Sequence, residues 1–197
     1  MSKHYNNYNY SNILDEIDRV GEATVRRDLS SFACPPSPKI ENFIRNRAID
    51  FARRKISITY IVSAPDDGEI LGFFTLAHKA LMIPPHKLSN TSRKRLERFA
   101  RFDQPTGQYM ASAFLIAQLG KNYAIDDGKR ITGAELLSIA NDILTDVQHL
   151  IGGGVIYLDS EDTQKLMQFY EHEAFYKFGE RYSDEEEQRY IQYLRFF

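Results

Sequence analysis

Hydrophobic residues recur along this 197-residue chain in two patterns, and each pattern predicts one kind of element. Apolar residues three and four positions apart mark helical segments at residues 40–55 and 133–150. Runs rich in β-branched and aromatic residues predict strands at residues 57–64 and 70–77. Between these runs lies Pro-Asp-Asp-Gly, at residues 65–68, which is typical of a hairpin turn. The first half of the chain therefore combines a helix with a pair of antiparallel strands.

The rest of the chain continues the alternation of helices and strands. Three glycines at residues 152–154 end the long helix, and Ser160 is expected to cap the helix that follows. The first twelve residues are rich in Tyr and Asn and are expected to form a polar arm. The order of elements predicts a single mixed α/β (α+β) domain over residues 13–197. The other expected elements are a short helix at 12–21, a basic helix at 88–103, strands at 109–120 and 155–159, a helix at 160–174, and a final strand pair at 175–179 and 190–197.

Composition places the chain among ordinary globular proteins. It is 43% hydrophobic and 26% charged, which provides enough apolar material for a core. The formal net charge of -2 gives no overall attraction to nucleic acid, although it leaves room for local patches. Cys34 is the only cysteine, so no intrachain disulfide can form. With no run near the ~18 apolar residues of a membrane span and no signal peptide, we expect a cytoplasmic protein without a membrane partner.

A polar junction between a loop and a helix, at residues 124–134, is the first candidate for chemistry. Backbone N–H groups at a helix N-terminus bind phosphate well, and Lys129 and Arg130 stand beside them. The stretch lacks the glycine pattern and the Lys-Ser/Thr ending of known nucleotide-binding loops. The alternative is structural: Gly128 makes a turn and Thr132 caps an ordinary helix.

Tyr170, near the end of the helix expected at 160–174, is the second candidate. A phenol held in a site can donate a proton to a leaving group. A tyrosine at the border between core and water is also an ordinary packing residue. Taken alone, the residues around Tyr170 favour the packing role.

The second half of the chain resembles the GNAT superfamily of N-acetyltransferases, which use acetyl-coenzyme A. Four pieces follow the family's order: the strand FLIAQLGKN, the junction GKRITGAELL, the strand VIYLD and the segment LMQFYEHEAFYKFGER. The front half, with FACPPSPKIENFIRNRA before the strand pair, is similar to the branch that contains toxin-type acetyltransferases. The resemblance covers residues 30–197 and implies a twisted, mostly antiparallel sheet flanked by helices. It also implies a V-shaped opening between the two middle strands, in which acetyl-coenzyme A would lie.

The resemblance further implies which residues hold the coenzyme. In the family, main-chain N–H groups at the junction bind the pyrophosphate, and the end of the preceding strand offers backbone groups to the pantetheine arm. Gly128 and Ile131 depart from the family's pattern, so the side chain of Ile131 must point away from the ligand. The matching residues are Leu119, Gly120 and Lys121 on the strand, and Gly128, Lys129, Arg130, Ile131, Thr132, Gly133 and Ala134 at the junction.

Tyr170 matches the position at which many members of the family carry the tyrosine that protonates the departing thiolate. The implied reaction is direct attack of an amine on the thioester, so Cys34 is not needed as a nucleophile. The five histidines lack the spacing of a metal site, and we expect no metal. No general base is assigned among the four candidates His78, Glu97, Gln118 and Glu171.

The acceptor amine is the open question of the sequence. Residues 87–101 carry six Lys or Arg against one Glu, which fits either a solvated helix face or a landing site for RNA. Toxin-type relatives acetylate the amino acid on charged tRNA and are made with an antitoxin, and similar proteins are commonly homodimers. The first expectation is an acetyltransferase for a primary amine on a small molecule or peptide. The alternatives are acetylation of aminoacyl-tRNA, and a non-catalytic GNAT-fold module that binds a partner protein.

Overall fold

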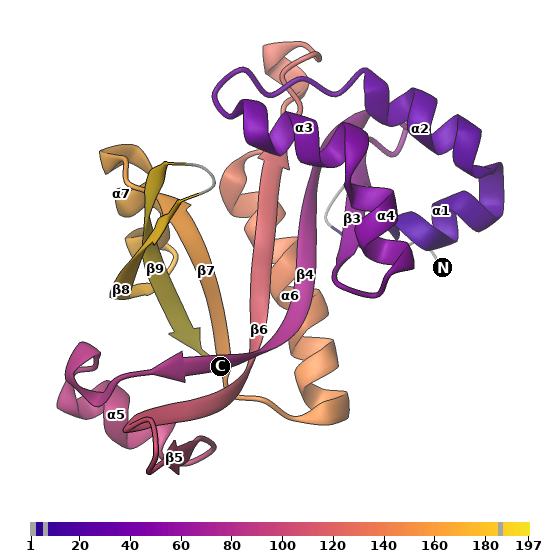
Figure 1. Cartoon of the computed structure of the whole chain (residues 1–197). Coiled ribbons are helices and arrows are strands. Elements are labelled where there is room, and N and C mark those ends of the chain that lie inside the picture. The colour runs from indigo at the N-terminus through magenta and orange to yellow at the C-terminus, as the bar shows by residue number, and fades with distance from the viewer. Residues whose placement is uncertain (1–2, 6–7, 185–186) are drawn as a thin grey trace. The chain divides into compact units, whose positions relative to one another are not determined.

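The computed structural model describes residues 3–5, 8–184 and 187–197 (Figure 1). Its strands are β1 (Lys3–Tyr5), β2 (Tyr8–Asn12), β3 (Ile58–Ser63), β4 (Ile70–Ile83), β5 (Arg101–Asp103), β6 (Gln108–Lys121), β7 (Val155–Glu161), β8 (Tyr176–Ser183) and β9 (Gln188–Phe196). Its helices are α1 (Ile13–Val20), α2 (Glu22–Ser30), α3 (Pro38–Asn46), α4 (Ala48–Arg53), α5 (Asn90–Leu96), α6 (Gly133–Ile151) and α7 (Gln164–His172), with single 3-10 turns η1 (Pro85–Lys87) and η2 (Asp127–Lys129).

The strands hydrogen-bond in the order β1-β2-β3-β4-β6-β7-β9-β8, with β5 beside β6. The pair β6 and β7 is parallel, whereas β1–β2, β2–β3, β3–β4, β5–β6, β7–β9 and β8–β9 are antiparallel. The ladder between β6 and β7 holds three residue pairs and stops at Leu115 and Tyr157, although β6 continues to Lys121 and β7 to Glu161. The predicted α+β fold, with a mostly antiparallel sheet and middle strands that pair at one end, is confirmed.

The chain folds as two compact units, and the first comprises Met1–Ala77 with Ile116–Ile143. Alternate residues of β4 serve opposite faces of its sheet. Phe73 packs into the cluster formed with α1–α4, whereas the position of Gly72 faces Leu136 of α6. The buried members of this cluster are Ile13, Val25, Leu29, Phe32, Cys34, Phe43, Ile44, Ala48, Ile49, Ala52, Ile61 and Phe73.

The second unit comprises His78–Leu115 with Leu144–Phe197 and has a core of its own. Its helix α5 begins at the capping residue Ser89, whose hydroxyl accepts from the amide of Ser92, and its one buried residue is Leu96. The core joins α5 to the strands of this unit through Leu81, Ile83, Leu96, Tyr109, Ala111, Ala113, Val155, Tyr157, Phe178, Leu194 and Phe196.

Several local predictions differ from the structure. Tyr8–Asn12, expected within a polar arm, form strand β2 because they pair antiparallel with β3. The helix predicted at residues 40–55 is two helices, α3 and α4, separated by Arg47 with φ -121°. Ser160 does not cap a helix: it is buried in β7, and the hydroxyl of Thr163 accepts from the backbone instead. Among the described residues, no helix has the length and apolar character required to span a membrane.

Candidate functional site

The junction between β6 and α6 is a 3-10 turn followed by a capped helix. The amides of Lys129 and Arg130 are used inside the turn, where they donate to carbonyls of the same loop. The amide of Glu135 then donates to the Thr132 hydroxyl oxygen at 3.1 Å, and the amide of Thr132 donates to the Glu135 carboxylate at 2.8 Å. This reciprocal pair is a capping box. The structural role considered for Thr132 is therefore real, whatever ligand the junction holds.

Lys129 is half exposed and stands between two carboxylates. Its Nζ lies 3.5 Å from Oδ2 of Asp67 and 3.8 Å from Oε2 of Glu69, both in the loop between β3 and β4. The backbone amide of Glu69, which donates to Asp67, and the charge of Lys129 hold the pKa of Asp67 below its usual value. The positive charge of Lys129 is thus largely balanced within the protein.

Arg130 turns its guanidinium inward to hold the loop. It donates to the carbonyl oxygens of Tyr123 at 3.0 Å and Ile125 at 3.2 Å, and it pairs with Asp127. Its guanidinium carbon also lies 4.9 Å from the centre of the Tyr123 ring. The side chain of Arg130 is used to hold the loop, so the role that we expect of Arg130 is to shape the backbone beside a ligand.

Ile131 stands where the family's pattern has a glycine, and its side chain is completely buried. A buried side chain points away from solvent, so it does not obstruct the backbone of the junction. In the described part of the chain, no hydrogen bond uses the amides of Ile131, Gly133 or Ala134. These three donors fit a pyrophosphate, but the fit is partial because the amide of Thr132 is already used by Glu135.

The end of β6 is packed closely on one face. A Cβ added to Gly120 would lie 2.5 Å from Cγ2 of Ile40 and 2.8 Å from a ring carbon of Phe73, so only glycine fits there. Leu119 and Lys121, on either side, are half-buried. The lack of space for a side chain is enough to explain why residue 120 is glycine. The expected binding of pantetheine at residues 119–121 stays a prediction about the backbone.

Tyr170 lies in the last full turn of α7 among aromatic rings. Its ring centre is 5.0 Å from that of Phe169, 5.9 Å from Phe175 and 5.6 Å from Tyr193. Burial, reinforced by Tyr193, raises the pKa of Tyr170 to about 12, although part of the residue remains exposed. The phenol therefore keeps its proton at neutral pH.

Comparison with solved structures identifies the fold. AtaT complexed with acetyl-methionyl-tRNAfMet has a TM-score of 0.65 and 16% identity, over 93% of both chains. A tyrosine-to-phenylalanine variant of KacT has a TM-score of 0.63 and 15% identity, over 94% of both chains. The chain has the GNAT fold. This confirms the resemblance read from the sequence.

A further solved structure adds bound molecules to the comparison. It is a tyrosine-to-phenylalanine variant of the AtaT toxin bound to acetyl-CoA and to the C-terminus of the antitoxin AtaR. Its TM-score is 0.62 at 15% identity, with 97% of this chain and 94% of that chain covered. No protein-family model matches the sequence, and no curated protein matches it. At these identities the likeness establishes the fold alone.

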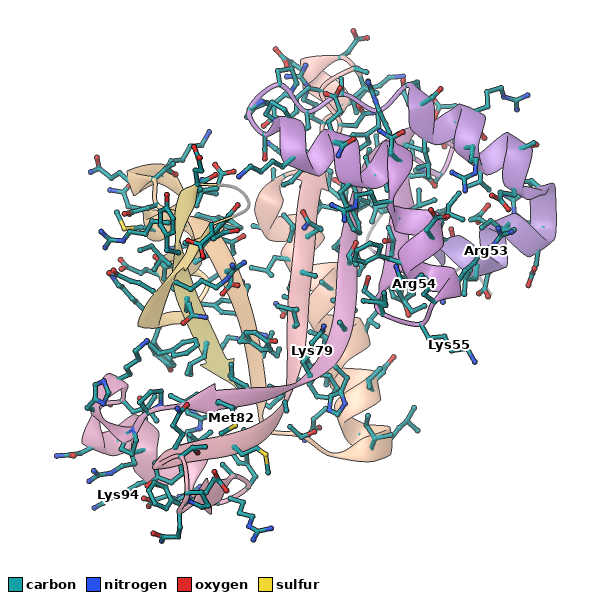
Figure 2. All side chains as sticks on the ribbon, in the orientation of Figure 1. Arg53, Arg54, Lys55, Lys79, Met82 and Lys94 are labelled. Atoms are coloured by element: carbon teal, nitrogen blue, oxygen red, sulfur yellow. The ribbon has the colours of Figure 1, made fainter. Side chains whose placement is uncertain are left out.

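The second unit presents a basic and partly apolar surface around α5, which we call the α5 surface. Arg95 is not free within it, because it donates to the carbonyl oxygen of Phe197 at 2.7 Å and stacks on Phe196. Among the described residues, Lys94, Arg98 and Arg101 form no ion pair or hydrogen bond through their side chains. Figure 2 labels Lys94 on α5. The exposed members are Lys94, Arg98, Phe99, Arg101, Phe102 and Met110.

The candidates for a general base remain unassigned. His78 is exposed, and its Nε2 lies 2.8 Å from the hydroxyl of Ser112. Glu97 accepts a hydrogen bond from the hydroxyl of Tyr109. Both side chains thus have structural partners. The described residues contain no group of three His, Cys, Asp or Glu side chains arranged to hold a metal ion.

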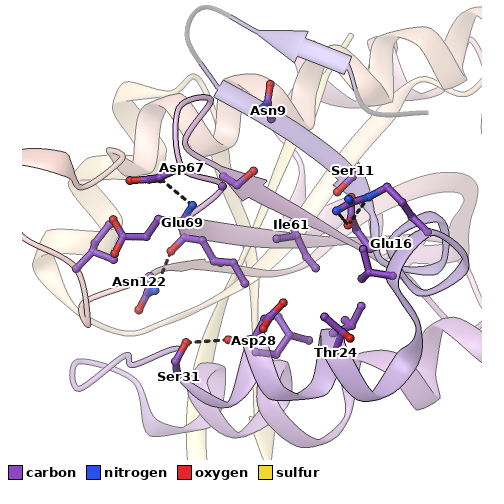
Figure 3. A pocket seen from close by; sticks show the side chains of 18 of the residues that line it. Asn9, Ser11, Glu16, Thr24, Asp28, Ser31, Ile61, Asp67, Glu69 and Asn122 are labelled. Atoms are coloured by element: carbon purple, nitrogen blue, oxygen red, sulfur yellow. Dashed lines mark hydrogen bonds and ion pairs between the residues drawn. The ribbon is translucent and has the colours of Figure 1, made fainter.

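A polar cavity of about 720 Å³ lies within the first unit, between α1, α2 and one face of β2 and β3 (Figure 3). The two strands form one wall of the cavity, where Asn9 lies opposite Ser63 and Ser11 lies opposite Ile61 in the antiparallel ladder. Several acids line it, but Glu16 is paired with Arg19, and the two acids of the β3–β4 loop are paired with Lys129. The lining combines apolar side chains with four acids, Glu16, Asp28, Asp67 and Glu69, and one arginine, Arg19, and no motif of the sequence predicts this cavity.

Two residues that shape the junction, Glu135 and Tyr8, were not identified from the sequence. Glu135 lies three residues after Thr132, and this Thr-x-x-Glu spacing is the signature of a capping box that the sequence does contain. Tyr8 lies 127 residues away and donates its hydroxyl to Oε1 of Glu135 at 2.9 Å. Nothing in the sequence links these two positions.

Proposed function

We propose that this chain is an acetyl-coenzyme A-dependent N-acetyltransferase whose acceptor is the amino group of an aminoacyl-tRNA. The observation that carries the proposal is the fold shared over 93% of the chain with AtaT, which was solved with acetyl-methionyl-tRNAfMet. This similarity supports a tRNA acceptor over a small amine or a peptide. The antitoxin-bound AtaT structure supports a second proposal, that a protein partner regulates this chain.

The α5 surface supports an RNA acceptor. Lys94, Arg98 and Arg101 are exposed and uncommitted, which is what contacts with phosphates require. Phe99 and Phe102 are exposed to 39% and 38%, beside these cations. Unpaired bases of single-stranded RNA stack on aromatic rings of this kind. The overall charge of -2 does not oppose this role, because the positive charge is concentrated locally.

Acetyl-coenzyme A would supply a thioester carbonyl that the amine attacks directly. In this chain the amides of Ile131, Gly133 and Ala134 would hold its pyrophosphate. The backbone at Leu119, Gly120 and Lys121 would hold the pantetheine arm. Lys129, Arg130 and Gly128 would shape the loop around the phosphates, and Thr132 would fix the start of α6.

Tyr170 would supply the proton for the departing sulfur. With a pKa of about 12 it is fully protonated at neutral pH and available as a donor. A thiol has an ordinary pKa of about 8.5, so giving up this proton outright is uphill by roughly three to four pKa units. Tyr170 must therefore regain a proton as it loses one, and the proton released by the attacking amine balances the step. The phenol then acts as a relay that begins and ends protonated.

The test is transfer of radiolabelled acetyl groups from acetyl-coenzyme A to a panel of aminoacyl-tRNAs. Tyr170→Phe should lower turnover by about 100-fold or more, because a positioned proton donor contributes on that scale. It should leave the Kd for acetyl-coenzyme A nearly unchanged. Lys94→Glu with Arg98→Glu should raise the KM for tRNA and reduce its salt dependence. Arg54→Glu with Lys55→Glu, which reverses two exposed cations outside the α5 surface, is the matched control.

Three results would contradict the proposal or one of its parts. Full turnover by Tyr170→Phe would remove Tyr170 from the chemistry. Acetylation of free amines or peptides with no acetylation of any charged tRNA would reject the acceptor and restore the general acetyltransferase. Failure to bind acetyl-coenzyme A at millimolar concentration would favour a non-catalytic module that binds a protein.

A further inference from the structure

The N-terminus of α6 is occupied by a carboxylate of its own chain. Oε2 of Glu135 accepts from the Thr132 amide at 2.8 Å and from the Thr132 hydroxyl at 2.7 Å. Oε1 accepts from the hydroxyl of Tyr8 at 2.9 Å. A capping box needs only the contacts with Thr132, so the bond from Tyr8 is an additional restraint on the carboxylate. Three donors hold one charged group at the helix end.

The carboxylate of Glu135 is negatively charged at neutral pH. Burial would raise the pKa of Glu135, but hydrogen bonds from the Thr132 hydroxyl and amide and from Tyr8 outweigh burial and lower it. Burial and the bond to Glu135 raise the pKa of Tyr8 to about 12, so Tyr8 remains a donor. The positive end of the helix dipole is thus already satisfied by an internal anion.

We propose that Glu135 is an affinity-determining residue that competes with the coenzyme's pyrophosphate for the N-terminus of α6, and that Tyr8 holds it in the competing position. This inference rests on the proposed use of acetyl-coenzyme A. A pyrophosphate bound to the amides of Ile131, Gly133 and Ala134 lies next to the Thr132 amide that Glu135 occupies. Glu135 must then either move, breaking the bond from Tyr8, or remain as a like charge beside the phosphates.

The surroundings do not compensate for this repulsion. Lys129 is shared between Asp67 and Glu69, and Arg130 is bonded to loop carbonyls. Neither of these cations is therefore available to offset the repulsion between Glu135 and the phosphates. Removal of its charge should strengthen binding of the coenzyme rather than weaken it, which is the opposite of what a mere helix-capping role predicts.

The experiment is isothermal titration of the full chain with acetyl-coenzyme A and, separately, with inorganic pyrophosphate. Glu135→Gln is the main variant, because glutamine preserves the capping box while removing the charge. We expect its Kd for both ligands to fall by roughly ten-fold at low salt. Tyr8→Phe should give a smaller fall, since it only frees the carboxylate to move. Asp142→Asn, which neutralises an exposed acid farther along α6, is the control and should bind like the wild type.

The outcomes separate this inference from the proposed function. Tighter binding by Glu135→Gln and Tyr8→Phe but not by Asp142→Asn supports the inference. Equal or weaker binding by Glu135→Gln, with a wild type that binds acetyl-coenzyme A, overturns it and leaves the proposed function standing. If wild type and variants all fail to bind acetyl-coenzyme A, both fall together. Thermal melting of each variant checks that the helix cap is intact.

Discussion

Gly72 of β4 lies against the backbone of Gly120 in β6, and its replacement by alanine gives a quantitative test of that packing. A Cβ at Gly72 would lie 2.8 Å from the carbonyl oxygen of Gly120 and 3.0 and 3.1 Å from the two methyl carbons of Leu136. The side chain of Leu136 can rotate away. The carbonyl belongs to β6, which neighbours β4 in the sheet, and cannot move without disturbing the strands.

The expected cost follows from this distinction. Overpacking a filled interior costs about 1–3 kcal/mol, and contact with backbone places Gly72→Ala at about 2 kcal/mol or above. For a chain of this length, each kcal/mol lowers the melting temperature by about 2–4 °C. We therefore expect Gly72→Ala to melt about 4–8 °C below the wild type in differential scanning calorimetry. Because the displaced carbonyl belongs to Gly120, binding of acetyl-coenzyme A should weaken as well.

Gly128→Ala is the matched control for this prediction. No heavy atom lies within 4 Å of a Cβ built there, and its φ is not in the left-handed region. Its free energy of unfolding should remain within about 0.5 kcal/mol of the wild type. If Gly72→Ala melts at the wild-type temperature, or if both variants lose the same stability, the close approach of β4 to β6 is wrong.

Two further predictions concern the second unit. Tyr193→Phe should leave the melting temperature unchanged or raise it slightly, because the Tyr193 hydroxyl is buried with no hydrogen-bond partner among the described residues; a large loss of stability would mean that the hydroxyl has a structural partner. Thr163→Ala should cost about 1 kcal/mol by chemical denaturation, because Thr163 caps α7. Ser160→Ala should cost less, since Ser160 makes one long bond to a neighbouring carbonyl at 3.2 Å, and the reverse ranking would restore Ser160 as the cap.

Strong local signals account for the part of the fold that the sequence predicted. The hairpin at residues 65–68 is real, with β3 and β4 on either side, because a turn-forming tetrapeptide separates two apolar runs. Helix α6 follows its apolar face from Gly133 and ends at Ile151, before the glycines, where Gly152 adopts φ 77°. These features depend on residues close in sequence.

The elements that were missed depend on distant partners. Helix α2 buries only Val25 and Leu29, which are too few apolar positions to produce a clear helical period. Its residue Glu22 pairs with Arg26 in the same helix and with Arg53 of α4. Strand β2 is polar because one of its faces, with Asn9 and Ser11, lines the cavity rather than the apolar core. Its pairing with β3 compensates for the weak apolar pattern. Neither the ion pair between Glu22 and α4 nor the pairing of β2 with β3 can be recognised from a local sequence pattern.

The candidate site also combines features that local motifs predict with features that depend on distant residues. The position of Tyr170 and the junction with α6 follow from short motifs, and the fold agrees with them. The charge state of the junction does not follow, because it is set by side chains from other elements. Asp67 and Glu69 come from the β3–β4 loop and Tyr8 from β2. The sequence predicted Lys129 and Arg130 beside a phosphate, whereas in the folded loop both side chains are paired with acids.

The paired charges of the junction suggest that the two ligands of the proposed function, acetyl-coenzyme A and tRNA, bind through different kinds of interaction. At the junction, Lys129 and Arg130 are already paired with acids, so the proposed binding of the coenzyme would rely mainly on backbone amides. At the α5 surface, the cations Lys94, Arg98 and Arg101 are exposed and unpaired among the described residues. Binding there releases counterions and must weaken steeply with salt. Under the proposed function, a protein of net charge -2 would bind RNA through local charge and its acyl donor through backbone hydrogen bonds, so salt should weaken the first interaction more than the second.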